Sequence, residues 1–357
     1  MSALKKKIPL TLGLLLSGAI LFYLFSKHFA DVEAIGDKIE WAWVWVSAFC
    51  AFGSYSMAGF ALEEALLIFE HKLLLMESLG IALVSTTINY FISTAGASGF
   101  ALKAHLLRKR GVPYGTTVLV SVLSSVILYL VLALILAQGL LYLILRLHGT
   151  TILVMESAAG LLILLAVSVP ILVFLFNRGI RGKIMKRLSR RVERGIFFFL
   201  KTGIPKESFE AFERQLEEGL SRVRRGRAQL TRMIVFTGAD WVFLMSSLYF
   251  AFRAVGVSLS VGYLTAGFTM AMAAMLVPIL PAGLGIMEGS LAAVFSGFGV
   301  DWDKALVAAL LYRLAYQALP GLVSIFVFWG LKISEPSLSR AAMAEEQNQE
   351  GNSLCEK

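Results

Sequence analysis

Three charged side chains lie inside long apolar stretches, where a membrane would make them costly. Arg313 lies in the stretch that begins near residue 305, Glu288 follows a glycine-rich break, and Asp240 lies in a stretch that begins near Met233. Isolated charges at membrane depth face the protein interior or water and usually have partners. The planar donor fork of an arginine suits phosphate oxygens. We therefore treat these three side chains as candidates for binding a phosphate-bearing ligand.

Each of these charges also has a structural interpretation. Arg313 and Glu288 could form a buried ion pair that holds the region around Glu288 to the last apolar stretch. This interpretation competes directly with phosphate binding by Arg313. Asp240 is interpreted as a structural hydrogen-bonding group first and as a proton carrier second. Tyr312, the neighbour of Arg313, belongs to the candidate site as well.

Two broken apolar regions supply the rest of the candidate site. The first runs from Ser78 to Leu107 with a break at 93–99, and the second from Gly262 to Phe298 with a break at 278–285. Glycines permit tight turns, and helix N-termini after such breaks can direct positive dipole ends at an anionic headgroup. Lys103 has an alternative role, in which it simply reaches the lipid headgroups. The predicted binding residues in these regions are Asn89, Gly96, Gly99, Lys103, Gly283 and Gly285.

Residues that would indicate catalysis or a metal are missing from the sequence. It contains no nucleophile–base pair and no phosphate-binding glycine loop of the nucleotide-hydrolase type. Its four histidines lack ligand spacing, and its two cysteines, Cys50 and Cys355, make no framework. The sequence therefore predicts no catalytic residue, no metal site and no cofactor.

The composition indicates an all-α polytopic membrane protein. Hydrophobic residues make up 57% of 357 and charged residues 16%, with a mean hydropathy of +0.75, whereas soluble domains average about 25% charged residues. A helix needs about 20 apolar residues to cross a hydrocarbon core of about 30 Å. The first stretch lacks a signal-peptide cleavage pattern and is taken as a span. The predicted full spans are 8–25, 41–62, 114–147, 151–176, 234–252 and 305–331.

Positive charge is concentrated in one segment. Residues 177–232 contain 16 Lys and Arg against 6 Glu, which places this amphipathic insert on the cytoplasmic side and against anionic lipid. Nucleic-acid binding is not expected, because topology and lipid contact account for the charge. We predict a membrane domain over 1–334, with both termini cytoplasmic, and a disordered tail over 335–357.

The same charge rule decides how the broken regions lie in the membrane. If residues 74–95 crossed fully, Arg108–Arg110 and the whole basic insert would lie outside. A hairpin over 78–107 that enters and leaves by the cytoplasmic face puts every basic cluster inside, and 262–298 then enters from outside. We therefore expect about six full spans plus two re-entrant helical hairpins.

The two halves of the chain resemble each other. Gly111-Val112 aligns with Gly299-Val300 at an offset of 188 residues, and the charge argument gives the halves opposite orientations. We expect an inverted repeat, with repeat A near 41–137 and repeat B near 234–331. Inverted repeats with broken helices are typical of transporters, and broken backbone at membrane depth must be buried in protein or line a wet cavity. The expected site is a polar cavity between the two breaks, open toward lipid.

A family resemblance follows from the second half. The run Pro281-Ala-Gly-Leu-Gly-Ile-Met-Glu-Gly289, with Gly299-Val300 and Leu311-Tyr-Arg-Leu314 after it, resembles the C-terminal signature of the lysylphosphatidylglycerol synthase membrane domain. This family is also called flippase-like, and the resemblance covers about residues 10–330. The resemblance implies lipid translocation in a bacterial or archaeal cytoplasmic membrane. Full synthases of the family translocate aminoacylated phosphatidylglycerol, and stand-alone relatives translocate other lipids, including hopanoids or polyprenyl-linked sugars. Full synthases carry an aminoacyl-transferase domain after the membrane part. This chain ends at Lys357 without one, so we expect no transferase activity.

The leading functional hypothesis is a lipid flippase that moves an anionic or phosphate-bearing lipid between leaflets. One alternative is a secondary transporter of a small polar solute, and another is a non-transporting membrane scaffold for a lipid-modifying enzyme. A lipid path should open sideways to the bilayer, whereas a solute path should be closed to it. The expected partners are membrane lipids with phosphate headgroups.

Overall fold

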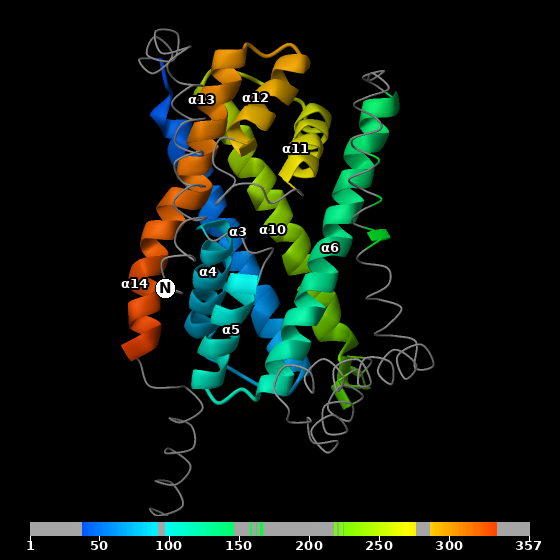
Figure 1. The fold of residues 1–357 in the computed structure, drawn as a ribbon, viewed down its shortest axis with the longest axis vertical. Coiled ribbons are helices and arrows are strands. Elements are labelled where there is room, and N and C mark those ends of the chain that lie inside the picture. The colour runs from blue at the N-terminus through cyan, green and yellow to red at the C-terminus, as the bar shows by residue number, and fades with distance from the viewer. Residues whose placement is uncertain are drawn as a thin grey trace, which may run out of the picture.

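In the computed structural model, the described part of the chain is helical and contains no strand (Figure 1). The structure describes residues 38–91, 97–145, 218–219, 221–223, 225–275 and 286–333, with single positions at 158, 162, 165 and 166. The elements in chain order are α3 (Trp41–Ile68), α4 (Leu75–Phe91), α5 (Ala97–Lys109), α6 (Tyr114–Leu145), α10 (Arg227–Ala254), α11 (Val261–Met275), α12 (Ile286–Gly297), α13 (Trp302–Arg313), the π-helix η2 (Leu314–Ala318) and α14 (Leu319–Ile333).

These elements form two series with the same order of lengths. The first long helices, α3 and α10, each contain 28 residues. Two short helices follow in each series, of 17 and 13 residues in the first and 15 and 12 in the second. Each series ends in a helix of 32 residues, α6 in the first and the continuous helix Trp302–Ile333 in the second. We call α3–α6 unit A and α10–α14 unit B.

The turns between helices repeat as well. At four helix ends a residue with positive φ is followed by an amide that donates to the carbonyl five residues earlier, which is a common way for an α-helix to end. The residues with positive φ are Glu70, Gly111, Gly256 and Gly299. The bonds, each 3.0 or 3.1 Å long, run from His71 to Leu66, Val112 to Leu107, Val257 to Phe252 and Val300 to Phe295. Each unit therefore has this turn after its first long helix and after its second short helix.

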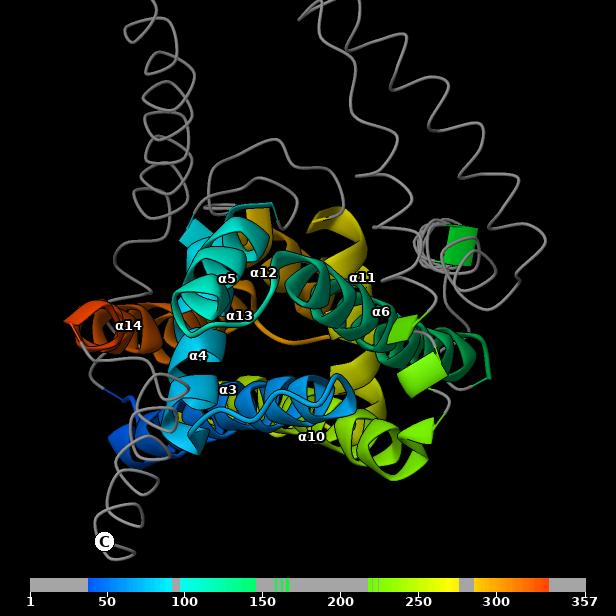
Figure 2. The same ribbon diagram turned by 90° about the horizontal axis from the view of Figure 1, so that it is seen from below.

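The first long helices of the two units pack against each other in opposite directions. The backbone amide of Glu40, just before α3, donates to the carbonyl of Ala254 at the end of α10. At the other end of the pair, Arg232 forms an ion pair with Glu64 at 2.7 Å. Figures 1 and 2 show α3 and α10 side by side along their lengths. Units A and B thus meet through equivalent helices that run antiparallel.

Among the described residues, four helices are long and apolar enough to cross a membrane: Trp41–Ile68, Gly115–Tyr142, Arg227–Ala254 and Trp302–Ile333. They coincide with four of the six predicted spans, and the protein is a multi-pass helical membrane protein. α10 begins at Arg227, before the predicted start at residue 234, so it extends into the range assigned to the basic insert. The predicted span 8–25, most of 151–176, most of the insert and the tail lie outside the described residues.

The short helices fall in the two regions predicted to be hairpins. At a rise of about 1.5 Å per residue, even the 17 residues of α4 fall short of a hydrocarbon core of about 30 Å. Figure 1 shows α4 and α5 beside each other near one end of the long helices, and α11 and α12 near the opposite end. The chain segments that join each pair, residues 92–96 and 276–285, lie outside the described residues.

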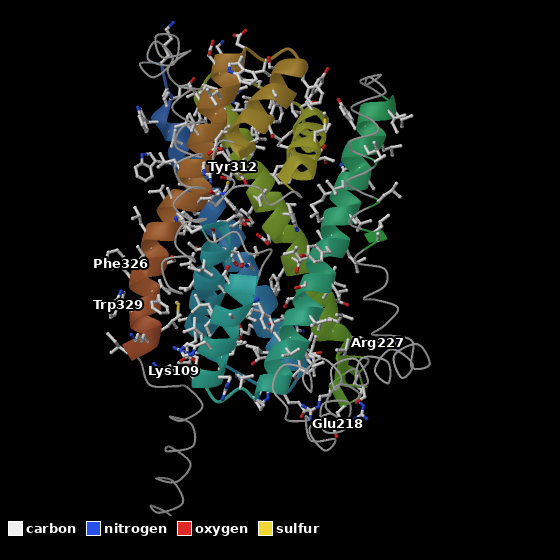
Figure 3. The ribbon with its side chains drawn as sticks, in the orientation of Figure 1. Lys109, Glu218, Arg227, Tyr312, Phe326 and Trp329 are labelled. Carbon is white, nitrogen blue, oxygen red and sulfur yellow. The ribbon has the colours of Figure 1, made fainter. Side chains whose placement is uncertain are left out.

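Apolar side chains both fill the bundle and cover its outside. Phe252, Phe268 and Phe295 are fully buried where α10, α11 and α12 meet. On the outside, Phe326 is 77% exposed, and Figure 3 shows Phe326 and Trp329 on α14 at the edge of the bundle. Large exposed apolar surface is unfavourable in water, whereas it is the ordinary state of a helix face that contacts lipid.

Candidate functional site

Arg313 and Glu288 contact each other directly. Arg313 is the last residue of α13, and Glu288 lies in the first turn of α12. Arg313 Nη1 donates to Glu288 Oε1, and the two side chains are 11% and 1% exposed. The structure therefore contains the predicted ion pair, which joins the start of the second short helix to the last long helix.

The helix changes its winding immediately after Arg313. Residues Leu314–Ala318 form the π-helix η2, which widens the turn inside an otherwise continuous helix. Such insertions occur frequently at functional sites. Tyr316 and Gln317 are buried there, and Gln317 Nε2 lies 3.8 Å from Met287 Sδ. The widened turn thus contacts the residue next to Glu288, and it holds the start of α12 from a second direction.

Asp240 lies at the contact between α3 and α10 and joins a chain of hydrogen bonds. Ser54 Oγ donates to Asp240 Oδ1 and lies 3.1 Å from Tyr316 Oη. Tyr55 Oη donates to the backbone carbonyl of Tyr316 at 3.0 Å. We call Asp240, Ser54, Tyr55 and Tyr316 the Asp240 network. It connects both units, because α3 belongs to unit A and both α10 and η2 belong to unit B.

Ser54 and Asp240 occupy the same position in their units. Ser54 is the fourteenth of the 28 residues in α3, and Asp240 is the fourteenth of the 28 residues in α10. At 1.5 Å per residue, each lies about 20 Å from either end of its helix. The Asp240 network therefore lies midway along the two long helices.

Four tyrosines pack together around the π-helix. The ring of Tyr316 lies 5.4 Å from Tyr55, 5.8 Å from Tyr90 and 5.4 Å from Tyr312, measured between ring centroids. Separations of this size are typical of favourable aromatic pairs. Because Tyr312 precedes Arg313 and Tyr90 follows Asn89, the cluster places the Asp240 network beside both parts of the predicted site. Of these tyrosines, only Tyr312 was predicted from the sequence.

Asn89 and Gly99 hold the two arms of the first short-helix pair together. The amide of Gly99, in the first turn of α5, donates to Asn89 Oδ1 at 2.7 Å, and Ser98 Oγ lies 3.2 Å from the same oxygen. A Cβ atom on Gly99 would lie 2.4 Å from the carbonyl oxygen of Ser85. Only a glycine permits this close approach, so these two predicted residues have a structural role here.

Other predicted residues lie apart from this arrangement or outside the described chain. Lys103 is half-buried on α5, and it forms no hydrogen bond or ion pair with any residue in the described ranges. Gly96, Gly283 and Gly285 lie outside the described residues, as does most of each glycine-rich break. The cavity predicted between the two breaks therefore remains a prediction.

A groove of about 680 Å³ lies between α6, α10 and α11. Its lining is mostly apolar, and its rim includes Leu134 and Val242, which are 71% and 66% exposed. Trp241 also lines it, and the indole N–H of Trp241 is buried without a hydrogen-bond acceptor in the described part of the chain. Trp241 follows Asp240 in α10, so the groove and the Asp240 network involve the same stretch of this helix.

A second buried ion pair lies toward the opposite end of the bundle, and sequence reasoning missed it. Arg110 is fully buried, with Nε 3.2 Å from Glu77 Oε1, and its Nη2 donates to the carbonyl of Leu331 at 3.1 Å. Lys109 Nζ donates to the carbonyl of Lys332, and Figure 3 shows Lys109 beside the end of α14. Cations at a helix C-terminus are favourable. From the sequence, Arg110 was predicted only as a charge that sets topology, because no spacing relates it to α14.

Comparison with known proteins places the chain in a family. A sequence profile described as "Lysylphosphatidylglycerol synthase TM region" matches residues 10–324. The chain is 25% identical over 260 residues to a UPF0104 membrane protein of Methanothermobacter thermautotrophicus, which covers 68% of this chain and 71% of that protein. It is 27% identical over 123 residues to a UPF0104 membrane protein of Methanocaldococcus jannaschii, and this aligned region covers 33% of this chain and 52% of that protein. The chain therefore belongs to the lysylphosphatidylglycerol synthase transmembrane-region family.

Proposed function

We propose that the protein moves a lipid with a phosphate-bearing headgroup between the leaflets of a bacterial or archaeal cytoplasmic membrane. One observation carries this proposal: a polar network lies midway along the long helices, and the same stretch of α10 lines an apolar groove whose rim is exposed. A lipid has both kinds of group, since its headgroup needs polar partners and its acyl chains need apolar surface. Membership of the synthase membrane family agrees with a lipid-related role.

Units A and B form an inverted repeat in this proposal. Three observations support it: the matched helix lengths, the matched helix-ending turns, and the antiparallel contact between α3 and α10. α4 and α5 then enter from the cytoplasm, where Lys109 and Arg110 lie, while α11 and α12 enter from outside near Asp301 and Asp303. This arrangement follows the positive-inside rule, and substrate sites of such repeats lie at the repeat interface near mid-membrane.

The headgroup contacts the region around Arg313. A guanidinium has five N–H donors in a fixed fork, so an arginine that contacts a carboxylate can also donate to a phosphate. Glu288 fixes the position of Arg313, and η2 brings the tyrosine cluster next to it. In this proposal the ion pair positions the phosphate-binding arginine, so the two interpretations of Arg313 are compatible.

The groove is the feature that favours a lipid over a small polar solute. Its apolar lining would offer nothing to a soluble substrate, whereas an acyl chain could lie in it with its other surface in the bilayer. The buried N–H of Trp241 would suit an ester carbonyl near the start of an acyl chain. A scaffold that transports nothing would need neither feature.

Filling the groove tests the proposal. Val242→Trp places a large side chain at the groove rim, and Ile325→Trp is the matched control at an exposed apolar position on α14. In proteoliposomes containing a headgroup-labelled phospholipid, we expect Val242→Trp to slow movement of the label between leaflets and Ile325→Trp to leave it unchanged. If wild type moves no lipid but takes up a soluble phosphate ester, the solute hypothesis is correct. If it moves neither, the scaffold hypothesis is favoured.

A further inference from the structure

We propose that Asp240 takes up and releases a proton during transport, so that lipid movement is coupled to a proton gradient. The inference rests on the proposed function and adds its energy source. It is carried by three features of Asp240: its place between the two units, its lack of a cationic partner among the described residues, and the hydroxyl chain attached to it.

The place of Asp240 is defined by symmetry. Asp240 and Ser54 are equivalent positions of units A and B, and they contact each other. Equivalent residues of two inverted units can touch only at the axis that relates the units. Coupling ions of inverted-repeat transporters bind near mid-membrane at the repeat interface. A single carboxylate at this axis can respond to rearrangement of either unit.

The electrostatic surroundings of Asp240 differ from those of the buried glutamates. Glu288 is paired with Arg313, and Glu77 is paired with Arg110. Within the described ranges, no Lys, Arg or His forms an ion pair with Asp240. In the part of the chain that the structure describes, the titratable groups near Asp240 are Tyr55 on α3, Tyr90 on α4, Tyr312 on α13 and Tyr316 on η2.

All four of these groups are phenols, which are neutral near pH 7. A carboxylate removed from water without a cation is costly, and uptake of a proton relieves that cost. Asp240 is partly exposed, so a water molecule that reaches its open side can deliver or accept the proton. Proton uptake is less favourable for a paired glutamate such as Glu288, because it would remove the negative charge that balances its arginine.

The hydroxyl chain suits both protonation states of Asp240. With Asp240 ionised, Tyr316 Oη–H donates to Ser54 Oγ, and Ser54 Oγ–H donates to Asp240 Oδ1. With Asp240 protonated, its own O–H donates to Ser54 Oγ, and Ser54 donates to Tyr316 Oη. Hydroxyl groups are both donors and acceptors, so the chain reverses direction without losing a bond.

The chain ends on the element that leads to the proposed headgroup site. Tyr316 lies in the π-helix, and its ring stacks on that of Tyr312, next to Arg313. π-Helical turns can rewind locally, because they hold one residue more than an α-helical turn. When Asp240 is protonated, Tyr316 no longer donates its hydroxyl proton to Ser54. Because Tyr316 lies in the π-helix, this change would favour a different winding of that turn. Headgroup binding and proton binding would thus act on the same turn.

An imposed pH gradient tests the inference with purified protein in sealed proteoliposomes of phosphatidylglycerol and phosphatidylcholine. For one proton per lipid, a gradient of one pH unit should shift the steady-state ratio of labelled phosphatidylglycerol between leaflets by up to about tenfold. Asp240→Asn should lose the response of the leaflet ratio to the gradient. Asp240→Glu and the control Ser47→Ala, at another buried serine of the α3–α10 contact, should keep the response.

Two outcomes would overturn the proton site: a wild-type distribution that stays equal under the gradient, or Asp240→Asn that responds as wild type does. If no lipid moves with or without a gradient, the proposed function itself fails. A second measurement needs no variant. A pH dye trapped in wild-type vesicles should report proton movement when a leaflet gradient of the lipid is imposed, and an unchanged signal would contradict coupling.

Discussion

Ser54 and Asp240 hold equivalent positions in α3 and α10, and they are hydrogen-bonded to each other across the contact between the two units. This bond fixes where the two units meet, midway along both helices. Tyr316 extends it into the π-helix, and from there the tyrosine cluster leads to Arg313 and Glu288. A chain of contacts therefore leads from Asp240 through Ser54 and the stacked tyrosines to the helix that holds Arg313.

Removing Arg313 should destabilise the protein because the buried carboxylate of Glu288 would lose the guanidinium that balances its charge. Arg313→Ala should lower the free energy of unfolding by about 3–5 kcal/mol, and the double change Arg313→Met with Glu288→Gln should recover much of this loss. Thermal unfolding in detergent measures both. Arg232→Ala breaks the exposed pair with Glu64 and should have a much smaller effect. An Arg313→Ala protein with full stability and full transport would contradict both roles given to Arg313.

Gly99→Ala should separate the arms of the first short-helix pair. The new Cβ would lie 2.4 Å from the backbone oxygen of Ser85, and overpacking of this kind costs about 1–3 kcal/mol. Gly297→Ala, in the second pair, is the matched control, since its Cβ would meet nothing within 4 Å. Equal unfolding temperatures for the two variants would show that the Asn89–Gly99 contact does not hold the arms.

The topology can be read from single cysteines. A cysteine at Lys109 or at Arg190 should react with a membrane-impermeant thiol reagent only from the cytoplasmic side, and one at Asp303 only from outside. The reason is that the positive-inside rule places the basic clusters in the cytoplasm. Labelling of position 109 from outside would make the first short-helix pair a full crossing and would remove the inverted repeat.

Stability should depend on pH through His71, which lies in the turn after α3. Its pKa is lowered from 6.5, mainly by burial and then by the nearby Arg222, while Glu70 acts in the opposite direction. The neutral imidazole is therefore favoured in the folded protein. Its contribution to stability is present above pH 6.5 and is lost as the pH falls toward the lower folded-state pKa. His71→Gln should reduce this pH dependence, and an unchanged unfolding-temperature profile between pH 5 and 7 would contradict the assignment, since this range spans the ordinary histidine pKa of about 6.5.

The sequence predicted the features that depend on local composition. Four spans were located correctly, because a long apolar run is itself the requirement for crossing a membrane. The Arg313–Glu288 pair was one of the competing interpretations of these charges, since two opposite charges in apolar surroundings need each other. Each span is a single segment, and Glu288 and Arg313 lie in consecutive helices, α12 and α13.

The partners of Asp240 could not be found in the same way. The sequence match used an offset of 188, which fits the second half of each unit, whereas α3 and α10 start 186 residues apart because the short-helix regions differ in length. Ser54 is therefore aligned with Asp240 only once the helix bounds are known. Tyr316 faces the network because of the π-helix, which breaks the usual helical periodicity. The groove lies between α6, α10 and α11 rather than at a predicted residue, since it depends on how three distant helices pack.

Lipid translocation is tested most directly by the leaflet accessibility of a headgroup-labelled phospholipid in proteoliposomes of the wild-type protein. A membrane-impermeant quencher should remove the label from the outer leaflet alone in protein-free vesicles. With the protein present, we expect label from both leaflets to be lost, while a trapped soluble dye stays protected. Loss of the outer-leaflet label alone, with folded protein confirmed in the vesicles, would contradict lipid translocation.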